Sequence, residues 1–157
     1  MPIEILRIEQ IKLVRKPWGY ERWIADGAPT FGYVLKEIFI RAPHRSSIQF
    51  HKDKQESNYI QKGRGILHYS VDPIDIERYV AGNYSQEELN AMISGMRQHE
   101  LVAGTVFHIR PGFLHRVEAV EDLLMVEAST VDLDDVFRLA DDTGRGHGRI
   151  DSEHQNT

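Results

Sequence analysis

The chain of 157 residues is 41% hydrophobic and 27% charged, the composition of a soluble globular protein of one domain. Its 19 Lys and Arg against 24 Asp and Glu give a net charge of −5, which gives no reason to expect a nucleic acid or a membrane as partner. Cysteine is absent, which excludes disulfides, thiolate catalysis and Cys-ligated zinc. The N-terminal residues show no basic region followed by an apolar stretch, so we expect a cytoplasmic protein.

Short segments rich in β-branched and aromatic residues recur along the chain and predict β-strands. The first two lie at residues 33–40 and 47–50. Gly63 and Gly65 in "QKGRG" predict a hairpin between "NYIQ" and "ILHYSV". Three more strands are expected at 105–109, 115–120 and 123–129. Many short strands between Gly and Pro signals predict an all-β fold, an antiparallel sandwich or barrel.

One segment breaks the β pattern and predicts a short inserted helix at residues 85–96. Its apolar residues recur at helical spacing, and Ser85 with Glu88 has the signature of a capping box. The apolar stripe is explained by ordinary packing, and a lid is the alternative; the stripe consists of Leu89, Met92, Ile93 and Met96. We expect one domain over residues 1–145, followed by a polar, glycine-rich tail at 146–157 that is mobile.

The segment "SIQFHKDKQE" (47–56) places polar residues where a metal could be held. On a strand Gln49 and His51 point to one face, and Glu56 follows across a bend. His115 comes directly after the turn "RPGF" at the start of a later strand. Two nitrogen and two oxygen donors suit a divalent cation such as zinc, manganese, iron or nickel. Each residue could also be an ordinary structural one, and periodicity alone does not join residue 115 to the others.

These residues resemble the two cupin motifs. The first cupin motif is His-x-His, three or four residues, Glu, six residues and Gly, and here it begins at Gln49 and ends at Gly63. The second is a glycine, then Pro-x-Gly and a histidine, and here it runs from Gly104 to His115. Three further stretches resemble cupin-type mannose-6-phosphate isomerases and the C-terminal domain of bifunctional GDP-mannose pyrophosphorylases. These stretches are "KPWGYE" (16–21), "SIQFH" (47–51) and "DLDDVFRLADDTGR" (132–145).

The resemblance implies a double-stranded β-helix, or jelly-roll barrel, that holds a divalent metal. The implied ligands are Gln49, His51, Glu56 and His115, because a Gln-His-Glu-His set is the one seen in phosphomannose isomerases. Zinc is the expected metal, with Mn, Fe or Ni as alternatives. The chain departs from the family at "KDKQ" (52–55), in the longer stretch 72–98 and at Thr143. These departures lie around the mouth of the barrel and in the tail, where the substrate would be selected.

Basic residues near the expected site are candidates for the remaining roles. Lys36 matches a strand lysine of the family, Arg116 follows the second metal histidine, and His68 on a barrel strand could be the general base. Lys52 and Lys54 could bind a substrate phosphate at the rim, although loop lysines are usually solvated.

The resemblance favours a metal-dependent aldose–ketose isomerase acting on a sugar or a sugar phosphate like mannose 6-phosphate. Two alternatives stay open: a metal cupin of other chemistry, such as an iron dioxygenase or a lyase, and a non-catalytic sugar-binding or regulatory cupin. The expected partners are the small sugar and a second copy of the chain. Cupins commonly pair through an N-terminal strand, which "IEILRIEQIKLV" (3–14) could supply.

Overall fold

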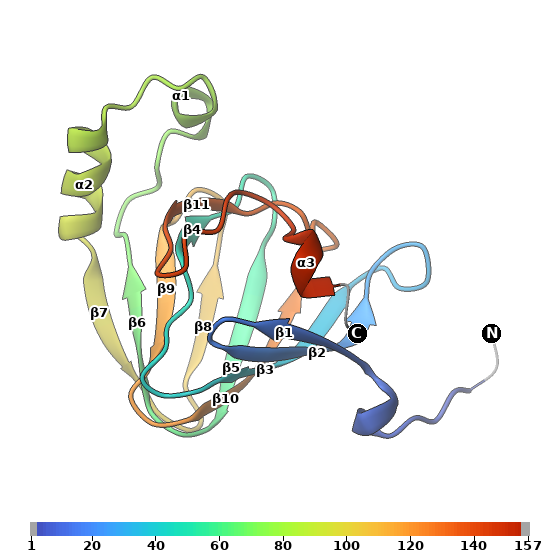
Figure 1. Ribbon diagram of the computed structural model, residues 1–157. Coiled ribbons are helices and arrows are strands. Elements are labelled where there is room, and N and C mark those ends of the chain that lie inside the picture. The colour runs from blue at the N-terminus through green and yellow to red at the C-terminus, as the bar shows by residue number, and fades with distance from the viewer. Residues whose placement is uncertain (1–2, 155–157) are drawn as a thin grey trace.

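The computed structural model describes residues 3–154, which form two antiparallel β-sheets packed face to face (Figure 1). The six-stranded sheet has the order β1-β2-β3-β10-β5-β8 and the five-stranded sheet the order β11-β4-β9-β6-β7. The first sheet contains β1 (Lys12–Lys16), β2 (Gly19–Asp26), β3 (Val34–Ile40), β5 (Glu56–Lys62), β8 (Val106–Ile109) and β10 (Leu123–Ser129). The second contains β4 (Ile48–Phe50), β6 (Gly65–Tyr69), β7 (Arg97–Leu101), β9 (His115–Ala119) and β11 (Phe137–Ala140). The predicted all-β barrel is confirmed.

The main core lies between the two sheets and follows from strict alternation along the strands. In β3 every second residue is buried, and in β10 the inward residues Leu123 and Met125 meet them. The other buried members of this core are Trp18, Ile38, Ile40, Ile60, Leu67, Leu101, Val117 and Ala119. Several of these apolar side chains also border the polar pocket described below, namely Trp18, Ile38, Ile40, Val117 and Met125.

The predicted hairpin at Gly63 and Gly65 is wrong. The segments on either side are strands, but β5 pairs with β10 and β8, whereas β6 pairs with β7 and β9. The glycines therefore carry the chain from one sheet to the other. Gly63 has φ +87°, and a Cβ on it would lie 2.0 Å from the carbonyl oxygen of Asp122, so only glycine fits this crossing.

A helical insertion separates β6 from β7, and it consists of α1 (Ile76–Val80) and α2 (Gln86–Ser94). The capping box of Ser85 and Glu88 is present, and Gly95 caps the helix after Ser94, so the helix is three residues shorter than the predicted 85–96. Helix α1 was not predicted.

The apolar side of this insertion covers the outer face of β4. The residues of the predicted stripe pack with Ile48, Phe50 and Leu114 in a second apolar cluster. Phe50 is fully buried there between the rings of Tyr79 and Phe137. Ordinary packing therefore accounts for the stripe.

The C-terminal end of the described chain lies beside the six-stranded sheet, whereas the N-terminal segment before β1 extends away from the barrel (Figure 1). At the N-terminal end the expected edge strand begins only at β1, after a short 3-10 helix at Ile8–Gln10. At the other end residues 146–154 lie against the barrel and include a short helix, α3 (Asp151–His154), which contacts β1. The expected mobility of the tail stays a prediction, and residues 155–157 lie outside the described residues. Within the described chain no helix is long and apolar enough to cross a membrane.

Candidate metal centre

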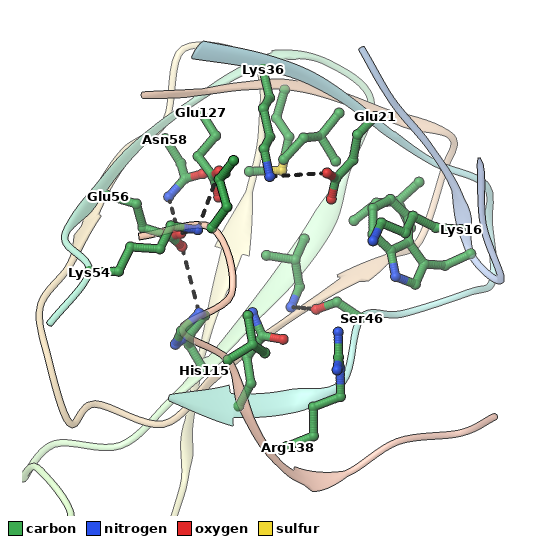
Figure 2. A pocket seen from close by; sticks show the side chains of 18 of the residues that line it. Lys16, Glu21, Lys36, Ser46, Lys54, Glu56, Asn58, His115, Glu127 and Arg138 are labelled. Carbon is green, nitrogen blue, oxygen red and sulfur yellow. Dashed lines mark hydrogen bonds and ion pairs between the residues drawn. The ribbon is translucent and has the colours of Figure 1, made fainter. Parts of the chain in front are cut away.

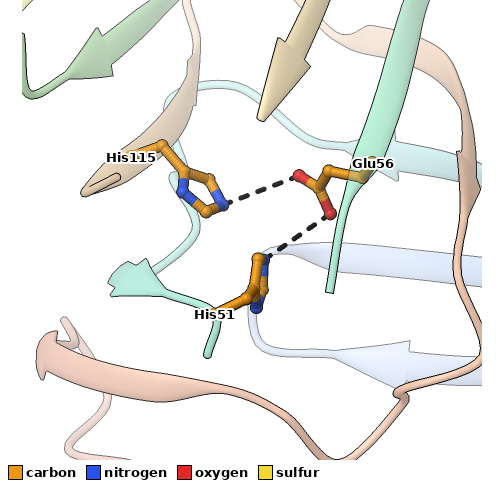
Figure 3. Close-up of side chains that lie close together, drawn as sticks. All are labelled: His51, Glu56 and His115. Carbon is orange, nitrogen blue, oxygen red and sulfur yellow. Dashed lines mark ion pairs between the residues drawn. The ribbon is translucent and has the colours of Figure 1, made fainter. Parts of the chain in front are cut away.

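Three buried side chains converge at the open end of the barrel and could hold a metal ion (Figure 3). Glu56 lies 3.6 Å from the Nε2 of His51 through one oxygen and 3.6 Å from the Nε2 of His115 through the other. Ligands bound at 2.0–2.2 Å around a tetrahedral metal are about 3.4 Å apart, so this spacing fits a divalent ion with little movement. His51, Glu56 and His115 come from the end of β4, the start of β5 and the start of β9.

Hydrogen bonds on the far side of each imidazole orient both histidines. The Nδ1–H of His51 donates to the carbonyl of Asp135 at 2.6 Å, and that of His115 to the carbonyl of Phe113 at 3.0 Å. A backbone acceptor at Nδ1 fixes the tautomer in which Nε2 carries a lone pair. Nε2 of both histidines is buried without a hydrogen-bond partner, whereas the buried Oε2 of Glu56 has Lys54 Nζ 3.0 Å away as an ion-pair partner. Two orphaned imidazole nitrogens beside a carboxylate fit a metal, which would satisfy both of them.

The protonation states of the two histidines and of Glu56 also suit metal binding. Burial lowers the pKa of His51 to about 3, with repulsion from His115 adding to the effect, and burial also lowers the pKa of His115. Both imidazoles are thus neutral and free to ligate at neutral pH. Burial opposes the charge of Glu56, but Lys54 and the two histidines outweigh it and hold the pKa of Glu56 well below its usual value.

The fourth expected ligand, Gln49, faces the same pocket. It lies on β4 directly opposite His115 in the ladder, and it lines the pocket together with Glu56 and His115. Its Oε1 accepts a hydrogen bond from Ser47 Oγ at 2.7 Å. Gln49 as a ligand stays a prediction.

Comparison with known proteins finds matches at the level of structure alone: no family model and no curated protein matches this sequence. CapF, a capsular polysaccharide assembling protein from Staphylococcus aureus, superposes with a TM-score of 0.60 at 11% identity. That alignment covers 83% of this chain and 34% of that one. Oxalate decarboxylase from Bacillus subtilis gives 0.63 at 11% identity, covering 85% and 31%. The chain has the cupin fold. It spans about a third of the length of these structures.

In this cupin barrel Lys54 lies deep in the pocket. The sequence predicts it at the rim, so this position is a correction. Its Nζ lies 3.0 Å from Glu56 and 3.6 Å from Glu127, and the side chain is almost completely buried (Figure 2). Burial opposes its charge, but the two carboxylates outweigh burial and raise the pKa of Lys54. Burial and the charge of Glu56 raise the pKa of Glu127 to about 8. Lys54 is therefore engaged inside the site, because the "KDKQ" bend turns it inward.

Lys52, the other expected phosphate ligand, is exposed and is not among the described residues that line the pocket. The backbone N–H groups of Lys52, Asp53 and Lys54 all donate to the carboxylate of Asp135. This carboxylate fixes the bend between His51 and Glu56, and the carbonyl of the same residue orients His51.

Lys36 points into the pocket, as the sequence suggested, and its partner is Glu21 (Figure 2). The Nζ lies 3.1 Å from Glu21 Oε1 and 4.6 Å from the centre of the Trp23 ring, while Trp23 Nε1 donates to the same carboxylate at 2.8 Å. Burial would raise the pKa of Glu21, but the charges of Lys36 and Lys16 outweigh burial and lower it to about 2. The pocket thus holds a buried lysine–carboxylate pair beside the metal centre.

The structure does not bring Arg116 and His68 to the pocket, which corrects the catalytic roles expected for them. They face each other across β9 and β6 on the outer side of the barrel, because each is the chain neighbour of an inward residue. Arg116 donates to the carbonyl of Ser46 at 2.6 Å and meets Asp142 at 3.4 Å. His68 Nε2 lies 2.7 Å from Glu118. Arg116 is buried and His68 is half-buried, and neither is among the described residues that line the pocket.

Several charged pocket residues were not assigned a role from the sequence. They are Lys16, Glu21, Glu127, Arg138, Arg145 and Arg149, all of which line the pocket. Lys16 and Glu21 lie at the ends of "KPWGYE", and Arg138 and Arg145 lie in "DLDDVFRLADDTGR". These four charged residues belong to motifs that carry the family resemblance. Only strand pairing, which the motifs do not show, brings both motifs to one pocket.

Proposed function

We propose that this protein is a metal-dependent aldose–ketose isomerase whose substrate is a sugar phosphate, such as mannose 6-phosphate. The observation that carries the proposal is a single pocket whose lining combines Glu56 and His115 of the metal triad, a buried lysine and an excess of cationic side chains. The resemblance of three sequence stretches to cupin-type mannose-6-phosphate isomerases supports the same substrate class.

The metal would be held by His51, Glu56 and His115, with Gln49 as the expected fourth ligand. A divalent ion at this place polarises a carbonyl or hydroxyl oxygen as a Lewis acid, which lowers the barrier to proton loss from the neighbouring carbon. With one anionic ligand a dication keeps a net positive charge. That charge favours a substrate whose oxygens become anionic during the reaction.

Lys36 is the residue best placed to carry a proton between the two reacting carbons or their oxygens. Its Nζ lies inside the pocket, and Glu21 and the face of Trp23 hold it there. General acid–base catalysis by a positioned side chain contributes about 10²–10⁴-fold. Lys36 therefore takes the role of general base, for which His68 is a candidate in the sequence.

The charge of the pocket argues for a phosphorylated sugar. Six cationic side chains line it, namely Lys16, Lys36, Lys54, Arg138, Arg145 and Arg149, against the three carboxyl groups of Glu21, Glu56 and Glu127. Lys36 and Lys54 pair with those carboxyl groups. Two of the arginines come from β11 and the turn after it, so the cationic excess lies on one side of the pocket. Glu153 pairs with Lys16 and Arg145, and Asp134 pairs with Arg149, so a phosphate group would take the place of a carboxylate at these cations.

The test is an isomerase assay on metal-stripped protein restored with Zn, Mn, Ni or Fe, using phosphorylated and free aldoses and ketoses. We expect turnover with a phosphorylated sugar. Lys36→Met should lower kcat by about 10²–10⁴-fold, while Lys62→Met, an exposed lysine on β5, should leave it unchanged. Binding of sugar phosphate without turnover under any metal would contradict the isomerase and favour a sugar-binding cupin. Oxygen consumption with bound ferrous iron would favour a dioxygenase.

A further inference from the structure

The C-terminal strap, defined here as residues 146–154, forms part of the wall of the metal pocket. Gly148, Arg149 and His154 line the pocket from this strap. His154 packs edge-on against the Trp23 ring at 5.1 Å, and the Arg149 guanidinium lies 5.7 Å from the same ring. The strap thus bounds the pocket on one side. Because its helix α3 has only four residues, side-chain contacts mainly hold the strap in place.

One carboxylate of the strap, that of Glu153, is bound by two cations of the pocket wall. Its Oε2 lies 2.6 Å from Lys16 Nζ and its Oε1 lies 3.1 Å from Arg145 Nη1. The three side chains are only 9–10% exposed. Asp141 already engages Nε and Nη2 of Arg145, so Nη1 is the donor left for another anion.

Lys16 and Arg145 lie between the metal pocket and the outside. Both line the inner pocket, and both also line a surface groove, whose other residues include Ile150, Ser152 and Glu153. The ion pairs of Glu153 therefore sit where a ligand would pass from the groove toward the metal centre.

A third donor lies in the same pocket. Arg138 donates from Nη1 to the carbonyls of Gly146 and Gly148, which ties the strap to β11. Its Nε is buried without a hydrogen-bond partner. A carboxylate offers two acceptor oxygens, whereas a phosphate ester offers three and a second negative charge.

We propose that Lys16 and Arg145 form the subsite for the anionic group of the substrate, and that Glu153 occupies this subsite in the free protein as an internal competitor. The identification of the anion as a sugar phosphate rests on the proposed function. A phosphate displaces Glu153 because it brings more charge to the same two donors. The strap, which loses its main ionic tie, then opens on substrate binding.

Inorganic phosphate is the probe that tests the subsite without any catalysis. Glu153→Gln removes the competing charge and keeps the size of the side chain, and we expect it to bind phosphate about tenfold more tightly than the wild type. The matched control is Glu87→Gln, which changes the net charge equally on the exposed face of α2 and should have no effect. Adding Lys16→Met to Glu153→Gln should abolish the gain. Equal phosphate affinity of wild type and Glu153→Gln would overturn the proposal.

A second measurement needs no variant. Phosphate added to the wild type should increase amide hydrogen exchange in residues 148–154 and change the fluorescence of Trp23, which the strap contacts. Unchanged exchange at saturating phosphate would overturn the proposal. Phosphate-induced release of the strap without isomerisation of any sugar would leave the subsite in place and refute the isomerase alone.

Discussion

Replacing Glu21 by Gln tests whether the pair of Glu21 and Lys36 is as strongly coupled as the structure indicates. Glu21 is 8% exposed, and its carboxylate accepts from Trp23 and pairs with Lys36. A pKa lowered from 4.5 to about 2 corresponds to about 3 kcal/mol at 1.36 kcal/mol per pH unit. Because the folded pKa is depressed, this stabilisation is present above pH 4.5 and is lost as the pH falls toward 2.

We therefore expect Glu21→Gln to be about 3 kcal/mol less stable than the wild type at pH 7 and only about 1 kcal/mol less stable at pH 3. Urea denaturation of both proteins at several pH values between 3 and 7 measures this difference. A stability difference that does not change with pH would refute the coupling. So would a variant as stable as the wild type at pH 7.

Three further substitutions test the fold and the assignment of faces. Phe50→Ala should cost about 3–5 kcal/mol in urea denaturation, since Phe50 is fully buried beneath the insertion; a loss below about 1 kcal/mol would show that the insertion is not anchored there. Gly63→Ala should cost about 2 kcal/mol or more, because its Cβ would clash with the carbonyl of Asp122; a wild-type Tm would contradict the crossing between sheets. His68→Ala should keep metal content and kcat/KM within about twofold, whereas a loss of activity without loss of fold would restore His68 as the base.

Strand periodicity was sufficient to predict the face on which the candidate metal ligand Gln49 lies. Gln49 and the buried pair Ile48 and Phe50 point to opposite sides of β4, as alternation requires. The capping box likewise predicted the start of α2. Strand alternation and the capping box both depend only on residues a few positions apart in the chain.

Long-range pairing was beyond the reach of local patterns. Glycines that link two strands have the same appearance in a hairpin and in a crossing between sheets, and at Gly63 only the partners of β5 and β6 distinguish them. Neighbouring residues of a strand face opposite sides, but the sequence does not show whether Leu67 or His68 faces inward. Because Leu67 is buried, His68 faces outward. The third residue of the candidate metal triad, His115, needed the family resemblance, since no local rule links β9 to β5.

The charged pocket was missed because its members come from distant parts of the chain. Lys16 and Glu153 meet at 2.6 Å although they are 137 positions apart. A lysine and a glutamate in separate segments of the chain form no sequence pattern of their own. Only the fold shows that they lie at the edge of one site.

Metal content tests the central claim most directly. Elemental analysis of purified wild type should find about one divalent ion per chain, and His68→Ala, a histidine on the outer face, should retain it. His51→Ala should lose the ion, because it removes one of three converging ligands. Unchanged metal content in folded His51→Ala would contradict the proposed centre and the function built on it.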